Sequence, residues 1–211
     1  IDNFNSKIID FDFAMPINKH EYRNIYDLIN KLFYPGTPGY KPPECYYFDI
    51  VVNIRDKYTK RNTISNSLDD IMSDIISEFT KSIDVYYPQN VAAVVKNINE
   101  TPWGIYGGRN IFIAEFIEFV EKMQVMNLQT SFNKYFIKSN DDNPPLVLAW
   151  DVFSLGSVFL DIYLAIKEKE PSLWSNELDT KITYLLKGMV NGNPFKRLTL
   201  KQSLEYVEEN L

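Results

Sequence analysis

The chain has 211 residues, enough for one good-sized domain or two small ones, and its 45% hydrophobic and 24% charged residues exclude wholesale disorder. The net charge of −6 argues against electrostatic binding to nucleic acid or to an anionic membrane. A single cysteine and a single histidine exclude an internal disulfide, a zinc site of several cysteines and a metal site of two histidines.

The N-terminal region predicts a strand, a short helix and an ordered loop. Residues 7–11 form a short β-branched run after a turn, which is typical of the second strand of a hairpin. A short helix is predicted over residues 21–32. Residues 35–43 are dense in proline and glycine, so we expect an ordered loop there.

Two amphipathic helices are predicted in the middle of the chain. Ser67 and Asp70 resemble a capping box, and the apolar residues behind them keep helical spacing through Phe79. Asn110 is predicted to cap a second, strongly apolar helix. A shorter helix is expected between them over residues 91–95, whose purely apolar run is far too short to span a bilayer.

The C-terminal region predicts three helices. Residues 150–166 follow a break at 141–145 and are apolar nearly all round, which is typical of a buried helix. Two further helices are predicted over 182–190 and 200–207, with a turn at 191–194 between them. The elements together predict a mainly helical fold.

Four separated stretches resemble, in the right order, motifs of the protein kinase superfamily. Residues 7–14, KIIDFDFA, are similar to the strand and D-F-G turn, and residues 36–44, GTPGYKPPE, to the G-T-x-x-Y-x-A-P-E segment that closes the activation loop. Residues 151–156, DVFSLG, resemble the D-V-W-S-L-G start of the central helix of the large lobe. Residues 193–199, NPFKRLT, resemble the D-P-x-x-R-x-T turn before the last helix. The resemblance is to the large lobe of a serine/threonine-type kinase, starting just after the catalytic loop.

The resemblance implies roles for residues of the first two motifs. Asp10 corresponds to the aspartate that holds the magnesium ion bridging the nucleotide phosphates, and Phe11 to the ring that packs beneath the small lobe. Asp12, Thr37 and Tyr40 fall in the activation segment and substrate loop. Thr37 corresponds to the threonine that touches the catalytic base in serine/threonine kinases. For Asp10, a simple turn cap is the alternative.

Three further residues have implied roles that concern the fold. Glu44 corresponds to a carboxylate that forms a buried ion pair with an arginine near the end of the domain, here Arg197. This pair supports the fold and says nothing of activity. Asp151 corresponds to the aspartate that anchors the catalytic-loop backbone, with a helix N-cap as the alternative.

The chain departs from the family pattern in two important places. Asp12 replaces the glycine of the D-F-G turn, and its carboxylate either alters metal binding or faces solvent. Between Glu44 and Asp151 the family needs roughly a dozen positions, so about 95 residues are inserted. We therefore predict a metal-binding turn and activation segment over 1–44, a helical insertion over 45–145, and the remaining large-lobe helices over 146–211.

The implied fold is an α+β protein kinase-like fold, large lobe only. It is mainly α, with a short N-terminal β-hairpin remnant and the long insertion. The insertion serves either as a docking surface or as a helical pad over the lobe. No Gly-rich loop, phosphate-binding lysine strand or H-R-D catalytic loop occurs in the sequence. We therefore expect this chain alone to be inactive.

Two functions remain open. In the first, the chain is part of a serine/threonine-type kinase that transfers the ATP γ-phosphate to protein hydroxyls. Its complete form then uses ATP and Mg²⁺, acts on a protein substrate, and needs an N-terminal kinase half in the same protein or as a separate fragment. In the second, the chain is a pseudokinase or scaffold that binds protein partners through the insertion. In either case we expect no nucleic-acid or membrane partner and an intracellular location, in the cytoplasm or a virus-infected host cell.

The predicted activation segment lacks the residues that kinases commonly phosphorylate there. Between Phe13 and Gly36 there is no serine or threonine, and the only hydroxyl groups belong to Tyr22, Tyr26 and Tyr34. A phosphoserine or phosphothreonine paired with arginines therefore cannot order this loop. We hypothesise that packing of its aromatic side chains, and contact with the insertion, hold it constitutively.

Overall fold

The computed structural model describes residues 39–60, 68–86, 108–123, 146 and 148–211. Every regular element within these ranges is helical, so the mainly α fold class is confirmed for them. The strand and hairpin predicted near residues 7–11 and the helices predicted over 21–32 and 91–95 lie outside the described residues. The elements are α2 (Pro43–Lys60), α3 (Leu68–Tyr86), α5 (Arg109–Lys122), α7 (Leu148–Lys169), the 3-10 helix η4 (Pro171–Leu173), α8 (Asn176–Met189) and α9 (Leu200–Asn210).

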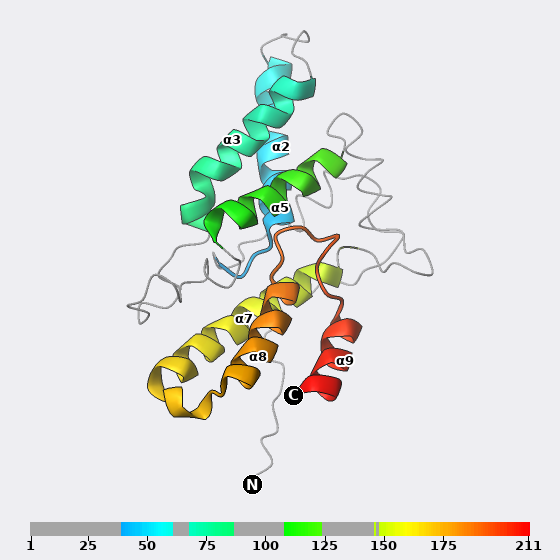
Figure 1. Cartoon of the computed structure of the whole chain (residues 1–211). Coiled ribbons are helices and arrows are strands. Elements are labelled where there is room, and N and C mark those ends of the chain that lie inside the picture. The colour runs from blue at the N-terminus through cyan, green and yellow to red at the C-terminus, as the bar shows by residue number, and fades with distance from the viewer. Residues whose placement is uncertain (1–38, 61–67, 87–107, 124–145, 147) are drawn as a thin grey trace, which may run out of the picture.

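The helices form two groups around a shared core. α2, α3 and α5 gather at one end of the molecule, and α7, α8 and α9 lie at the other (Figure 1). The main core is built by the first group, but Phe153 of α7 and Val190 at the end of α8 belong to it as well. Its largest fully buried side chains are Tyr47, Phe48, Phe79, Phe112, Phe116, Phe119, Phe153 and Ile75.

Helix α2 is not predicted from the sequence. Its first half is rich in aromatic and β-branched residues, which have lower helix propensity than alanine or leucine. Pro43 stands at the first helical position, where the missing N–H removes no intrahelical bond. Tyr47, Phe48 and Val51 are each at most 3% exposed, so burial of this apolar face outweighs the local propensity.

Helices α3 and α5 occur where the apolar spacing predicts them. Phe79 of α3 stacks on Phe116 of α5, with ring centroids 3.6 Å apart and planes at 13°. The predicted cap of α5 is wrong, because the helix begins at Arg109 and Asn110 is its second residue. Gly108 is the N-cap instead, at a φ of 110° that a side chain would strain.

Helix α7 is buried on one face only, so the prediction of burial nearly all round is wrong. Its buried face approaches the end of α8 so closely that a Cβ on Gly156 would lie 2.7 Å from the Cβ of Met189. The opposite face is apolar yet exposed, by 37–50% for each side chain. We call it the open face of α7, and it consists of Leu148, Leu155, Val158, Phe159, Ile162 and Ile166.

Among the described residues, α7 is also the one helix long and apolar enough to cross a membrane by length and composition. Core helices of other proteins meet the same criterion, and 39% of its most apolar window is buried inside the protein. Length and composition are therefore weak evidence that α7 spans a membrane.

The C-terminal end of α7 is fixed against α8 by Lys167. Its ammonium group donates to Asp179 of α8 at 2.7 Å and to the hydroxyl of Tyr163 at 2.9 Å.

The last two helices begin with side-chain caps. Ser175 accepts the N–H of Leu178, so α8 begins six residues before the predicted start. Thr199 and Gln202 form a reciprocal capping box at the start of α9, at the predicted boundary.

The predicted boundary between residues 44 and 45 falls inside α2. Among the described residues, the predicted insertion has no core of its own, because its helices share one core with Phe153 and Val190. The insertion and the C-terminal helices are therefore expected to unfold together.

We predict that Phe79→Ala lowers the free energy of unfolding by about 3–5 kcal/mol, because it removes a fully buried ring and leaves a cavity. Urea denaturation in a Trp103→Phe background measures it, with far-UV circular dichroism for all helices and fluorescence of Trp150 and Trp174 in the C-terminal part. The two signals should shift together. Val85→Ala on the same helix, at a side chain 72% exposed, is the control and should change stability by less than about 0.5 kcal/mol. A fluorescence midpoint that stays at its wild-type value would contradict a shared core.

Candidate functional site

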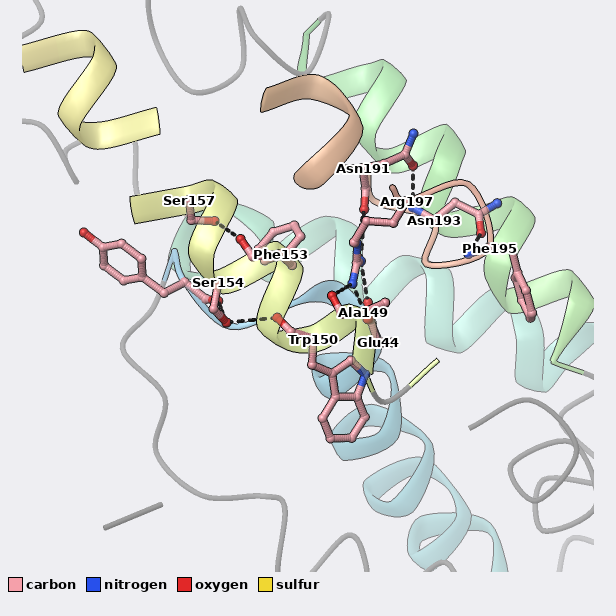
Figure 2. A network of polar contacts seen from close by, with 11 residues as sticks. Glu44, Ala149, Trp150, Phe153, Ser154, Ser157, Asn191, Asn193, Phe195 and Arg197 are labelled. Carbon is pink, nitrogen blue, oxygen red and sulfur yellow. Dashed lines mark hydrogen bonds and ion pairs between the residues drawn. The ribbon is translucent and has the colours of Figure 1, made fainter. Parts of the chain in front are cut away.

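A buried ion pair joins the two ends of the described chain. Nη1 of Arg197 donates to Oε1 of Glu44 at 2.7 Å, and Nη2 donates to Oε2 at 2.9 Å, across 153 positions of sequence. Both side chains are 0% exposed. Glu44 lies in the first turn of α2, where free backbone N–H groups favour a negative charge. Figure 2 shows Arg197 reaching from its turn toward Glu44 and the start of α7.

The remaining donors of Arg197 are also satisfied. Nη1 donates to the carbonyl of Ala149 in the first turn of α7 at 2.8 Å. Nε and Nη2 donate to the carbonyl of Asn191 at 3.1 and 3.0 Å. Together with the two bonds to Glu44, these bonds pair all five N–H groups of the guanidinium. One face of the guanidinium is covered by the ring of Phe153, whose centre lies 4.9 Å away. Arg197 thus joins the starts of α2 and α7 to the turn before α9.

The turn that carries Arg197 is held by its own side chains and by α5. The Asn191 side chain accepts the N–H of Asn193 at 2.8 Å, and the Asn193 side chain accepts the N–H of Phe195 at 3.1 Å (Figure 2). Lys196 forms ion pairs with Glu115 and Glu118 of α5 at 3.0 and 2.6 Å. A helix of the predicted insertion therefore supports the turn behind the buried pair.

Tyr40 is fixed on α7 by two hydrogen bonds. Its hydroxyl donates to the carboxylate of Asp161, and its carbonyl accepts the hydroxyl of Ser154 at 2.9 Å. The hydrogen bond to Asp161, together with burial, raises the pKa of Tyr40 to about 12. Burial raises the pKa of Asp161, although the bond from Tyr40 opposes the shift. The sequence motifs do not identify Ser154 and Asp161 as partners of Tyr40, but their spacing of seven places both on one face of α7.

The segment next to Tyr40 contacts α3. The N–H of Gly39 donates to the carbonyl of Tyr86 at 2.8 Å, and Gly39 has a φ of 93°. Lys41 pairs with Asp49 of α2 at 3.1 Å and lies 4.8 Å from the ring centre of Tyr46. Residues 39–41 therefore lie between α7 on one side and α2 and α3 on the other.

Asp151 lies in the first turn of α7 and not at its N-cap, since the helix begins at Leu148. Its side chain is exposed, yet the atoms crowded around it displace enough water to raise the pKa of its carboxyl. It makes no hydrogen bond or ion pair with the described part of the chain. The structure brings Glu44 to Arg197 and Tyr40 to α7, but leaves Asp151 apart from them.

The other predicted site residues, Asp10, Phe11, Asp12 and Thr37, lie outside the described residues. Within the described ranges no group of three or more histidine, cysteine, aspartate or glutamate side chains could hold a metal ion. Cys45 is buried, and its burial, reinforced by the charge of Glu44, raises the pKa of its thiol. A thiol in this state is a poor nucleophile.

No protein-family model, curated protein or solved structure matches the chain. The resemblance to protein kinases therefore depends on the four sequence motifs. The contacts of Glu44, Arg197 and Tyr40 are the structural observations that bear on it.

We predict that Arg197→Met lowers the free energy of unfolding by about 3–5 kcal/mol, because Glu44 is left buried and unpaired. Combining it with Glu44→Gln should recover part of the loss, since the uncompensated charge is then gone. Lys196→Met, at the adjacent residue whose own side chain is 44% exposed, is the matched control and should cost less than about 1 kcal/mol. Chemical denaturation measures all three variants. If Arg197→Met and Lys196→Met lowered the free energy of unfolding equally, the buried pair would contribute no more than exposed charges do.

Proposed function

We propose that the chain is part of a serine/threonine-type protein kinase, carrying the magnesium-binding turn and the activation segment of its large lobe. The observation that carries the kinase-like fold of this proposal is the buried pair of Glu44 and Arg197, and the presence of Asp10, Thr37 and Asp151 favours an active enzyme. The motifs select Glu44 and Arg197 from positions 153 apart, and they meet in a bidentate contact. Such a contact supports the assignment of residues 36–44 as the segment that closes an activation loop.

In this proposal, each site residue acts on nucleotide or substrate through a simple chemical property. Asp10 supplies a hard carboxylate oxygen for Mg²⁺, which neutralises charge on the ATP phosphates, and Asp12 places a second carboxylate two residues away. The resemblance implies that Thr37 contacts the base that accepts the proton of the substrate hydroxyl. The chain alone lacks the Gly-rich loop, the phosphate-binding lysine and the base, so it is not expected to bind ATP productively.

The open face of α7 supports the proposal of an N-terminal kinase half, in the same protein or as a separate fragment. Leu155, Phe159 and Ile162 lie on successive turns of this face and are 37–50% exposed. Asp151 lies one turn before Leu155, and the atoms around its exposed side chain raise the pKa of its carboxyl by desolvation. An apolar surface next to a partly desolvated acceptor is suited to a polypeptide that brings apolar side chains and backbone N–H groups. We propose that this polypeptide is the catalytic loop and the helices around it.

The second candidate function is a pseudokinase or scaffold. The observation that favours it is Asp12, which replaces the glycine of the metal-binding turn. A scaffold would keep the ion pair and the helical insertion but would transfer no phosphate. The two functions are therefore separated by activity and not by fold.

We expect the natural protein, captured from its source through an affinity tag, to transfer phosphate from Mg²⁺-ATP to serine or threonine of casein. Asp10→Asn should reduce the rate about 100-fold or more, because loss of a metal ligand removes several kcal/mol of transition-state stabilisation. Glu177→Gln, at an exposed carboxylate of α8, controls for handling and for contaminating kinases and should keep full activity. Labelling that is absent, or equal in the Asp10 variant, would exclude the kinase function and favour the scaffold.

The open face of α7 gives a separate prediction. Phe159→Lys should change the free energy of unfolding of the 211-residue chain by less than about 1 kcal/mol, because the side chain is already 44% exposed. In the natural protein with its N-terminal half, it should cost about 2–4 kcal/mol, because a charge is then buried without a partner. Chemical denaturation of both forms measures the difference. Tyr184→Lys, on α8 at a side chain 59% exposed, is the control with small effects in both. A small effect of Phe159→Lys in both forms would contradict a covered face.

A further inference from the structure

We propose that the helical insertion holds the substrate loop of this protein in its working position, with Tyr86 at the end of α3 as the positioning residue. The inference rests on the proposed kinase function, which assigns residues 36–44 to that loop. It adds that a helix of the insertion orders this loop, which in other kinases is ordered by a phosphorylated side chain.

The first step is the contact between the loop and the end of α3. Tyr86 is the last residue of α3, so its carbonyl has no acceptor role within the helix and is available to another donor. The N–H of Gly39 donates to this carbonyl at 2.8 Å. Gly39 reaches the contact with a φ of 93°, a backbone conformation that glycine adopts readily and other residues rarely do.

The second step is that the end of α3 is itself held in place. The rings of Tyr86 and Tyr46 stack with centroids 3.9 Å apart and planes at 15°. The ring of Phe79, a core residue, has its centroid 5.9 Å from that of Tyr86. Tyr46 is 7% exposed and belongs to the main core. The carbonyl that accepts from Gly39 is thereby fixed by buried aromatic packing.

The third step is that the loop is held from the opposite side as well. Tyr40 donates to Asp161 of α7, and Ser154 donates to the Tyr40 carbonyl at 2.9 Å. On the same side as α3, Lys41 pairs with Asp49 of α2 at 3.1 Å. Three consecutive residues therefore contact α3, α7 and α2 in turn, so α3 supplies one of three supports.

The fourth step is what the sequence lacks. No serine or threonine occurs between residues 13 and 36, so a phosphate on either residue type cannot order the loop there. The described contacts of residues 39–41 are the backbone hydrogen bond of Gly39, the hydrogen bonds of Tyr40 and the ion pair of Lys41, and none of them requires a phosphate group. They hold the loop without any modification, which makes the insertion part of the active conformation.

The test compares Tyr86→Ala with Tyr86→Phe. Amide hydrogen exchange followed by NMR on the 211-residue chain reads out the loop directly, and steady-state kinetics of the natural protein reads out substrate binding. In Tyr86→Ala we expect the Gly39 amide to exchange about tenfold faster, since a hydrogen bond and a ring stack are both weakened. The KM for casein should rise about tenfold while the KM for ATP stays unchanged. Tyr86→Phe keeps the ring and should restore wild-type values in both assays.

Val85→Ala, at the exposed neighbour of Tyr86, is the control and should leave exchange and kinetics unchanged. Should Tyr86→Ala accelerate exchange throughout the molecule, Tyr46→Leu serves as the second variant, because it keeps an apolar side chain in the core but removes the stack on Tyr86 and the hydroxyl that donates to the Tyr86 carbonyl at 3.5 Å. Lys41→Met is its control for the contact of Lys41 with the Tyr46 ring. Gly39 exchange that is unchanged in the variant that remains folded would overturn the proposal, as would a raised KM for ATP alone. Should no variant transfer phosphate, the kinase function fails, and the exchange of Gly39 still decides whether α3 holds the loop.

Discussion

The structure depends on one buried charge pair. Removing Glu44 and Arg197 from water costs several kcal/mol for each ion, and this cost is offset only where every hydrogen-bonding group finds a partner. Arg197 meets this condition, with two bonds to Glu44, one to Ala149 and two to Asn191. Because these acceptors belong to α2, α7 and the turn before α9, the pair fixes the relative positions of all three.

The helices of the predicted insertion contact the two segments that carry Glu44 and Arg197. α5 supports the turn that carries Arg197 through the ion pairs of Lys196 with Glu115 and Glu118. α3 contacts the loop that leads into Glu44 through the carbonyl of Tyr86. The insertion is therefore built into the site, and its core is continuous with that of the C-terminal helices.

The sequence predicts those elements whose signal is local. The apolar spacing predicts α3, and the helix predicted over 200–207 coincides with α9, because both depend on neighbouring residues alone. α2 is missed because burial overrides the low helix propensity of its aromatic and β-branched residues. The open face of α7 is missed because hydrophobicity does not say which faces are covered. The motifs identify Glu44 and Arg197 as a pair, but the acceptors at Ala149 and Asn191 are backbone carbonyls, which no side-chain pattern specifies.

The separation of Glu44 and Arg197 by 153 positions has a consequence for the order of folding. Contacts between distant residues form only after a long loop has closed, and the entropy of that closure is lost before the contact is made. α7 and α8 are joined by a short connection and can pair early. The ion pair forms only after α2 and the turn before α9 have come together. During synthesis, Glu44 is made long before Arg197, so α2 emerges with its carboxylate still in water. The site is completed only when the turn before α9 has been translated.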